Sequence, residues 1–235
     1  SSPVQALLER LHERHAGDMS GEVASYIPDL ATADPAWFGI SMVTADGSVY
    51  EVGDTRREFT IQSMSKPLTY AMVLGRHGSD VVDAKIGVEP SGEAFNEISV
   101  DSRRRPRNPM INAGAITAAS LLLPQHREVE PGVVDEAFAE LVEFYSACAG
   151  RRLTIDDEVY LSEKSTGSRN RAIAYMLDSF GVLGTDPDAA LGRGPRRRAP
   201  GGPRRQWCSC PVAGRMWEGW WNAGRFHQRD RKSVV

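Results

Sequence analysis

Two kinds of apolar spacing occur along this chain, the two-residue repeat of strands and the repeat of helices. Residues 37–43 and 49–52 are rich in β-branched and aromatic residues and flank residues 45–47, where Gly47 can supply the positive φ of a hairpin turn. Residues 59–61 are a third candidate strand. Helical spacing is found before and after these strands, at residues 7–11, 65–76, 110–123, 132–148 and 168–179. Strands followed by a block of helices predict an α+β fold.

Glycines mark the ends of two of the expected helices. Gly150 and Gly181 follow the last apolar positions of their segments, where a residue with positive φ commonly closes a helix. Gly17 is a plausible stop for the opening helix. No internal repeat interrupts this pattern before residue 191.

The chain changes character after Leu191. Residues 192–235 hold ten Arg and one Lys against Glu218 and Asp230, a net charge of +9, so the −3 of the whole chain leaves −12 for residues 1–191. The same segment carries four of the five Trp, seven Gly and four Pro, without a sustained period. These features predict two parts: a folded body over residues 1–191 and a divergent tail over residues 192–235.

The whole-chain composition excludes several classes of protein. With 41% hydrophobic and 25% charged residues it is typical of a globular protein. A net charge of −3 gives no general attraction to nucleic acid or an anionic membrane. The longest apolar stretch, residues 113–123, is well short of the roughly 18 residues that a membrane span requires. No basic segment followed by an apolar one opens the chain, so we expect a cytoplasmic protein.

Cysteine and histidine offer little metal chemistry. The three cysteines have no framework spacing, and Cys208 and Cys210 form a CxC pair with only His227 nearby, so no zinc site is expected. We interpret the histidines as surface or packing residues: His12, His15, His77, His126 and His227.

Ser63 and Lys66 are the best candidates for catalysis. Pro67 follows directly, so a regular helix cannot begin much earlier and residues 63–66 should form a tight or 3₁₀-like turn. In such a turn residues three apart lie nearly one above the other, which places the serine hydroxyl beside the amine. A lysine can act as base if its surroundings lower its pKa. A pair of this spacing also arises about once by chance in a chain of this size.

A serine β-lactamase or penicillin-binding enzyme is one alternative, because such enzymes carry SxxK together with SDN and KTG motifs. SDN is absent from this chain. Residues 164–167 (KSTG) resemble KTG but lead into the helical run 171–177, so we interpret them as a turn that enters a helix.

Six short blocks in order and at consistent spacing resemble the serine-dependent glutaminase family of bacteria and mitochondria. They are residues 26–28 (YIP), 53–55 (GDT), 62–67 (QSMSKP), 89–92 (EPSG), 108–116 (NPMINAGAI) and 162–170 (SEKSTGSRN). The resemblance covers about residues 20–190. It implies the β-lactamase/transpeptidase-like fold, with a central antiparallel sheet flanked by helices and a helical subdomain. It also implies assembly as a dimer or tetramer.

The resemblance implies hydrolysis of L-glutamine to L-glutamate and ammonia through an acyl-enzyme, without a metal or organic cofactor. Ser63 then corresponds to the nucleophile and Lys66 to its general base. Substrate-binding positions of the family, besides Ser63, fall on Tyr26, Gln62, Asn112, Glu163 and Asn170. An amino-acid substrate needs an anion for its ammonium group, which Glu163 can supply. Its carboxylate needs neutral donors, which Asn112, Asn170 and Tyr26 can supply.

Each of these positions also has an ordinary structural interpretation. Asn112 could be a helix cap or a packed polar residue, and Tyr26 a half-buried aromatic. Glu163 could lie in a solvated turn and Asn170 on a helix surface.

The resemblance stops after about Leu191. The family continues with two tyrosines of the site and a glycine-rich strand whose valine N–H completes the oxyanion hole, but no tyrosine follows Tyr175 here. We therefore expect the C-terminal strands to be missing and residues 192–235 to be a frameshifted or otherwise aberrant end. Two alternatives remain: a glutaminase-like protein that binds glutamine or glutamate without turnover, and an Arg-rich tail that binds nucleic acid.

Overall fold

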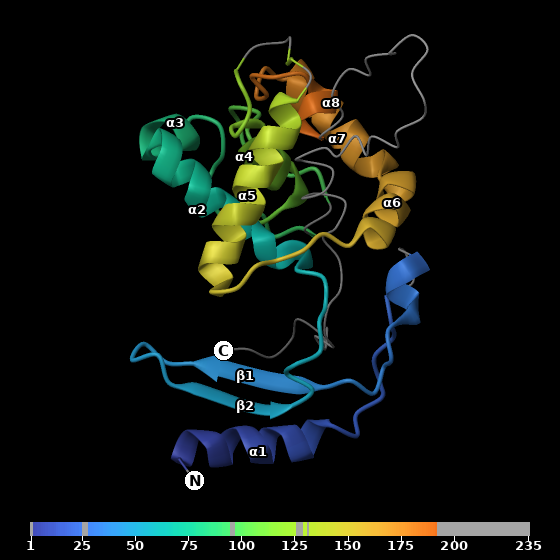
Figure 1. Ribbon diagram of the computed structural model, residues 1–235. Helices are drawn as coiled ribbons and strands as arrows, with labels where there is room; N and C mark the ends of the chain where they lie inside the picture. The colour runs from blue at the N-terminus through green and yellow to red at the C-terminus, as the bar shows by residue number, and fades with distance from the viewer. Residues whose placement is uncertain (1, 25–27, 95–96, 126–128, 131, 192–235) are drawn as a thin grey trace. The chain divides into compact units, whose positions relative to one another are not determined.

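The computed structural model describes residues 2–24, 28–94, 97–125, 129–130 and 132–191. The chain forms two compact units, whose described parts are residues 2–60 and 61–191 (Figure 1). The predictions for Tyr26, His126 and the whole tail, including Cys208, Cys210 and His227, lie outside the described residues.

The first unit combines helices with the predicted hairpin. It contains α1 (Pro3–His15), the 3₁₀ helix η1 (Pro28–Thr32), β1 (Gly39–Val43) and β2 (Val49–Gly53). The two strands pair antiparallel, from Gly39 opposite Gly53 to Val43 opposite Val49. Gly47 has φ +83°, and the Asp46 carboxylate accepts bonds from Thr44 and Ser48, so the turn is built as the sequence predicts.

Helix α1 lies along the hairpin (Figure 1). Leu8 is its buried residue, and the Gln5 amide donates a 3.1 Å hydrogen bond to the Glu51 carbonyl of β2. The His12 ring stacks on Phe38, with 5.1 Å between ring centroids. His12 is thus a packing residue, as predicted.

The third predicted strand, residues 59–61, is wrong. This segment has no strand structure and pairs with neither β1 nor β2. Phe59 is 66% exposed. A short segment of β-branched and aromatic residues becomes a strand only if a partner completes its hydrogen-bond ladder, and local composition does not supply that partner.

The second unit is helical, and four of its helices match the predicted segments. Those four are α2 (Ser65–His77), α4 (Asn112–Ser120), α5 (Val133–Ala149) and α7 (Ser168–Ser179). Gly150 caps α5 with φ +62°, and Gly181, with φ +71°, follows α7. The 3₁₀ turn η2 (Gln62–Met64) lies where a tight turn was predicted, whereas three further helices among the described residues were not predicted: α3 (Ser79–Asp83), α6 (Asp157–Thr166) and α8 (Pro187–Ala190).

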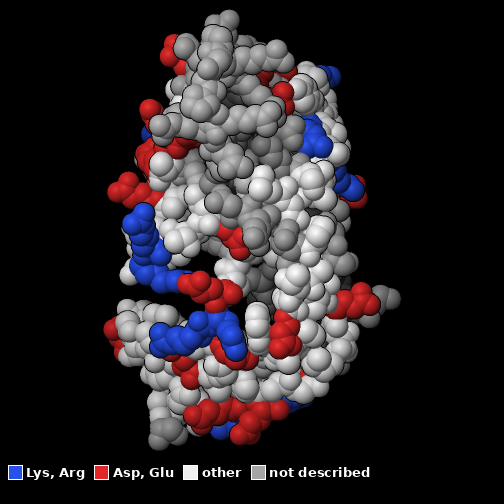
Figure 2. Space-filling model, turned by 45° about the vertical axis from the view of Figure 1, so that its right-hand side comes forward, with Lys and Arg blue, Asp and Glu red and all other residues white. Residues whose placement is uncertain are grey.

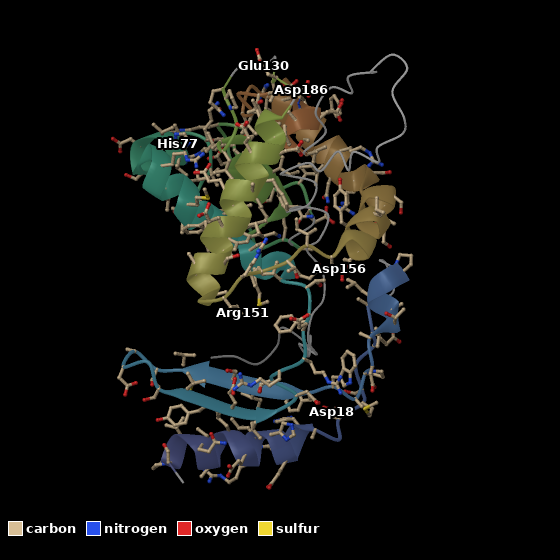
Figure 3. All side chains as sticks on the ribbon, viewed as in Figure 1. Asp18, His77, Glu130, Arg151, Asp156 and Asp186 are labelled. Atoms are coloured by element: carbon tan, nitrogen blue, oxygen red, sulfur yellow. The ribbon has the colours of Figure 1, made fainter. Side chains whose placement is uncertain are left out.

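Aspartates begin two of the helices that were missed. Asp156 accepts a 3.0 Å hydrogen bond from the Val159 amide at the start of α6. Asp186 does the same for Ala189 in α8, and both aspartates are labelled in Figure 3. Each side chain satisfies an amide that the first helical turn leaves without a backbone partner. These caps were the available sequence signal for both helices.

Helix α4 is the centre of the helical unit. All nine of its residues are buried, and most of them are small, so neighbouring helices approach its backbone closely. Ile116 packs in one core with Ile173 and Leu177 of α7 and with Leu191 after α8. Because Asn112 is the first residue of α4, this packed core fixes the position of a predicted site residue.

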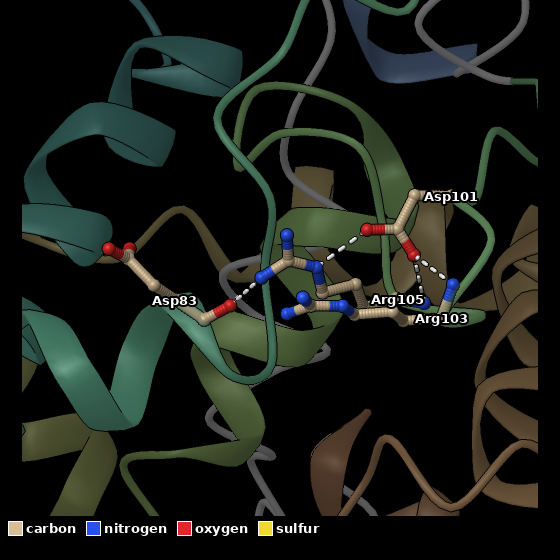
Figure 4. A network of polar contacts seen from close by, with 4 residues as sticks. All are labelled: Asp83, Asp101, Arg103 and Arg105. Atoms are coloured by element: carbon tan, nitrogen blue, oxygen red, sulfur yellow. Dashed lines mark hydrogen bonds and ion pairs between the residues drawn. The ribbon is translucent and has the colours of Figure 1, made fainter.

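A loop before α4 is tied down by an aspartate–arginine network (Figure 4). The Asp101 carboxylate accepts bonds from the Arg103 amide at 2.8 Å and from the Arg105 guanidinium at 2.6 Å. Arg105 also donates to the Asp83 carbonyl at the end of α3. Burial acts to raise the pKa of Asp101, but the bonds from Arg105 and Arg103 hold it below its usual value. The network therefore joins this loop to the end of α3. The loop precedes α4, which begins with the predicted site residue Asn112.

Charged side chains of both signs lie on the face of the molecule drawn in Figure 2. Surface ion pairs of the described residues include Arg169 with Glu97 at 3.2 Å and Arg56 with Glu51 at 2.5 Å. Exposed pairs of this kind contribute little to stability.

Replacing Gly114 by alanine is expected to destabilise the helical unit by about 3 kcal/mol, as overpacking against a rigid backbone does. A Cβ at this position would overlap the Asn108 carbonyl oxygen and lie 2.8 Å from the Pro109 Cα. Urea denaturation monitored by circular dichroism measures the change. Gly75→Ala in α2 is the matched control, since a Cβ there meets open space and should be neutral or stabilising. Equal stability of the two variants would contradict the close approach at Gly114.

Candidate active site

Ser63 lies in the turn that the sequence predicts. Residues 62–64 form the 3₁₀ helix η2, and α2 begins at Ser65, two residues before Pro67. The Ser65 amide donates to the carbonyls of Gln62 and Ser63, and its hydroxyl donates to the Gln62 carbonyl at 3.0 Å. Ser63 is half-buried and Lys66 is 3% exposed. The two residues are three positions apart, a spacing that places their side chains on the same face of this helical segment.

Gln62, directly before Ser63, has a left-handed backbone. Its φ is +46°, an uncommon value for a residue other than glycine. Such a conformation costs about 1–3 kcal/mol and persists only where the surrounding structure imposes it, often at functional sites. Gln62 is buried. The strained residue therefore directly precedes the predicted nucleophile. The sequence pattern did not reveal this strain.

Lys66 is held by the segment that precedes α4. Its Nζ donates to the Met110 carbonyl and to the Asn112 Oδ1, each at 3.0 Å. Burial lowers the pKa of Lys66 to about 8. A minor fraction of this lysine, about a tenth at pH 7, is thus neutral. Two N–H bonds leave the lone pair of the neutral amine for accepting a proton, as a general base requires.

Asn108 shapes the segment that contacts Lys66. Its Oδ1 accepts hydrogen bonds from the Met110 and Ile111 amides at 3.0 and 3.2 Å, and its Nδ2 donates to the Glu89 carbonyl at 3.0 Å. This turn directs the Met110 carbonyl at the lysine. Asn108 was not among the predicted site residues, although asparagine before proline favours such turns.

Asn112 joins Lys66 to α7. Its Nδ2 donates to Oδ1 of Asn170 at 3.3 Å, while its Oδ1 accepts from Lys66. Three of the predicted site residues, from three different helices, thus form one chain of hydrogen bonds. Asn112 is 8% exposed, and its side chain is used in this chain rather than as a cap of α4.

The other predicted positions are less completely described. Glu163 lies on α6, but its side chain is outside the described residues, as is all of Tyr26. Residues 164–166 form the last turn of α6, and Gly167 is the junction with α7. A turn was predicted over residues 164–167. Only Gly167 lies between the two helices, because residues 164–166 are helical.

His77 lies at the end of α2, where its Nε2 is 2.8 Å from the Leu121 carbonyl (Figure 3). It is a packing residue, as predicted. Within the described ranges no group of three or more His, Cys, Asp or Glu is placed to hold a metal ion. In the same part of the chain, none of the helices is long and apolar enough to cross a membrane.

A serine three residues before a buried lysine of lowered pKa is the arrangement of serine hydrolases in which lysine serves as base. Comparison with known proteins narrows this class. The sequence profile of the glutaminase family matches residues 21–193. Glutaminase 2 of Bradyrhizobium diazoefficiens is 49% identical over 190 residues, which are 80% of this chain and 29% of that protein. The glutaminase of Microcystis aeruginosa is 44% identical over 182 residues, 77% of this chain and 52% of that protein.

Solved structures give the same result. Mglu in its native form superposes with a TM-score of 0.73 at 39% sequence identity, covering 93% of this chain and 46% of Mglu. Mglu in its glutamate form gives a TM-score of 0.74. The chain belongs to the glutaminase family, which confirms the resemblance seen in its sequence blocks. It spans about half, or less, of the length of these relatives.

Proposed function

We propose that this chain hydrolyses L-glutamine to L-glutamate and ammonia through an acyl-enzyme on Ser63. The observation that carries the proposal is the buried Lys66, whose pKa burial lowers to about 8, three residues after a serine in a strained turn. Membership of a family whose relatives are named glutaminases supports the choice of substrate.

The reaction takes two steps. In the first, Lys66 Nζ takes the proton of the Ser63 hydroxyl while Oγ attacks the carboxamide carbon of glutamine. The carbon–nitrogen bond then breaks, and the proton held by Lys66 passes to the departing ammonia. In the second step water attacks the ester carbon, Lys66 takes a proton from this water, and the proton returns to Ser63 as glutamate leaves.

The proposed substrate site uses the predicted positions. Asn112 and Asn170 are adjacent amides, and such neutral donors suit the α-carboxylate of an amino acid. We assign Glu163 to the ammonium group and Gln62 and Tyr26 to the remaining polar contacts. The solved glutamate form of Mglu, a relative, supports an amino-acid ligand.

The rate of hydrolysis is expected to rise with pH up to about 8. Lys66 must be neutral to accept the proton, and with a pKa of about 8 only about a tenth of it is neutral at pH 7. We therefore expect kcat/KM to increase nearly tenfold per pH unit below pH 7.5 and to level off above pH 8.5. Initial rates from pH 6 to 9.5 measure this. A profile that is flat, or that falls over this range, would contradict Lys66 as the base.

The direct test of the function is product formation by the purified 235-residue chain. Glutamate and ammonia should appear in equal amounts from L-glutamine. D-Glutamine and L-asparagine serve as substrate controls, because they keep the amide but misplace it relative to the α-groups. A folded chain that binds glutamine by calorimetry but releases no ammonia would overturn the proposal and leave a binding protein.

Three broader proposals rest on the family resemblance. The fold is the β-lactamase/transpeptidase-like one, in agreement with the hairpin, the helical unit and the likeness to Mglu. The functional protein is a cytoplasmic dimer or tetramer without a cofactor. Residues 1–191 form the glutaminase part, since the family match ends at residue 193, close to the change in composition. Resequencing the coding region tests whether residues 192–235 are a frameshifted end.

A further inference from the structure

Tyr145 is a buried polar residue that the reaction above does not use. It lies on α5, is 6% exposed, and its ring packs near Phe144 with 6.2 Å between ring centroids. Its hydroxyl donates a 3.2 Å hydrogen bond to the Ser65 carbonyl and lies directly beside the Thr69 hydroxyl. The contact joins residues 80 positions apart in the sequence.

The Ser65 carbonyl lies within the turn that carries the reacting groups. Ser65 stands between Ser63 and Lys66, and its hydroxyl holds the Gln62 carbonyl. The Thr69 hydroxyl donates to the Ser65 carbonyl as well, at 3.0 Å. Two side-chain donors from two helices therefore converge on one peptide of this turn. A backbone strained at Gln62 needs such constraints to keep its conformation.

The hydroxyl of Tyr145 is a permanent hydrogen-bond donor and does not act in proton transfer. Burial raises the pKa of Tyr145 far above its usual value, so it stays protonated wherever the protein is folded. A group this deeply buried and bonded to the backbone does not reach the substrate. Its effect must pass through the turn.

We propose that Tyr145 is a positioning residue that, together with Thr69, fixes the turn from Ser63 to Lys66 through the Ser65 carbonyl. The inference rests on the proposed function of Ser63 and Lys66. In Tyr145→Phe the aromatic ring remains but the bond to Ser65 is lost. The serine hydroxyl then has more freedom relative to the amine, and misplacement of a reacting group by about 1 Å costs up to about 10²-fold in rate.

The test measures how fast Ser63 is phosphorylated by diisopropyl fluorophosphate. In this reaction Ser63 Oγ forms a bond to phosphorus, fluoride leaves, and Lys66 takes the hydroxyl proton. Intact-mass spectrometry of the full chain gives the rate per folded molecule between pH 6 and 9.5. Near-UV circular dichroism gives the folded fraction, and the kcat and KM for glutamine are measured alongside.

We expect Tyr145→Phe to slow labelling at least tenfold, to raise the midpoint of the pH profile, and to lower kcat with little change in KM. Thr69→Val should slow labelling severalfold. The double variant should slow labelling by less than the product of the two single-variant factors, because both donors act on one carbonyl. Tyr175→Phe is the control. It loses a hydroxyl bonded to Asp188 at 2.8 Å on the exposed side of α7 and should label like the wild type.

The outcomes separate the two proposals. If Tyr145→Phe and Thr69→Val label at the wild-type rate and midpoint, the positioning role is overturned while the function stands. If Tyr145→Phe does not fold, Thr69→Val decides between the same two results. A wild-type chain that neither labels at Ser63 nor releases ammonia overturns the proposed function, and the inference with it.

Discussion

Glutamate release from L-glutamine is expected to fall by about 10⁴-fold or more when Ser63 is replaced by alanine. In the proposed reaction the oxygen of this hydroxyl forms the acyl bond, and removing a nucleophile usually eliminates nearly all catalysis beyond that of binding. The substitution removes one oxygen from a half-buried residue, so the fold should be unaffected. The assay measures ammonia and glutamate from equal amounts of folded wild type and variant.

Ser179→Ala is the matched control for this substitution. Its hydroxyl donates to the Met176 carbonyl at 2.7 Å, at the exposed end of α7. We expect full activity in this variant. Turnover by Ser63→Ala above a hundredth of the wild-type rate would contradict Ser63 as the nucleophile and indicate another group or a contaminating enzyme.

Replacing Lys66 by methionine is expected to lower kcat/KM by about 10³-fold without unfolding the protein. Methionine fills a similar volume but cannot accept a proton, so the serine loses its base. The Met110 carbonyl and Asn112 each lose a donor, which destabilises the fold. Removing a buried charge offsets this cost. At pH 7 we therefore expect the free energy of unfolding to change by less than about 2 kcal/mol.

The pH dependence of stability distinguishes this lysine from others. The folded pKa of about 8 lies below the unfolded value of 10.5, so below pH 8 both states carry the charge and the folded state bears its burial cost. Between pH 8 and 10.5 the folded state releases the proton first. The wild type should thus gain about 3 kcal/mol relative to Lys66→Met across this window.

Lys85→Met is the control for this measurement. Lys85 also donates to a backbone carbonyl, that of Val182 at 2.9 Å, and lies outside the predicted site. We expect Lys85→Met to keep its activity, and its stability is measured beside that of Lys66→Met. Parallel urea titrations at pH 7.5 and 10 give the comparison. A Lys66→Met variant with more than a tenth of wild-type activity would contradict the assignment of the base.

Local patterns were sufficient for much of the fold. The hairpin around Gly47 and the four predicted helices of the second unit follow from periodicity and turn residues within each segment. The errors have physical causes as well. Residues 59–61 have residue types that favour strands but pair with neither β1 nor β2, and α6 and α8 begin with aspartate caps rather than with apolar repeats.

The site was predictable only in part, because local sequence patterns do not encode contacts between residues far apart in the chain. Ser63 and Lys66 lie in one turn, so their spacing and Pro67 predict their arrangement. The contact of Lys66 with Asn112 spans 46 positions and depends on the packing of α4, which no local period encodes. Family blocks identified both residues but not their hydrogen bonds. The left-handed Gln62 and the bond from Tyr145 could be found only in three dimensions.

The most direct test of the account is to trap the acyl-enzyme. Wild-type protein mixed with excess L-glutamine and quenched in acid within the first turnovers would be digested and examined by mass spectrometry. We predict a peptide containing Ser63 that carries the mass of one γ-glutamyl group, and no such peptide from Ser63→Ala. Glutamate formation by the wild type with Ser63 unmodified at every quench time, or with the γ-glutamyl group on another residue, would contradict it.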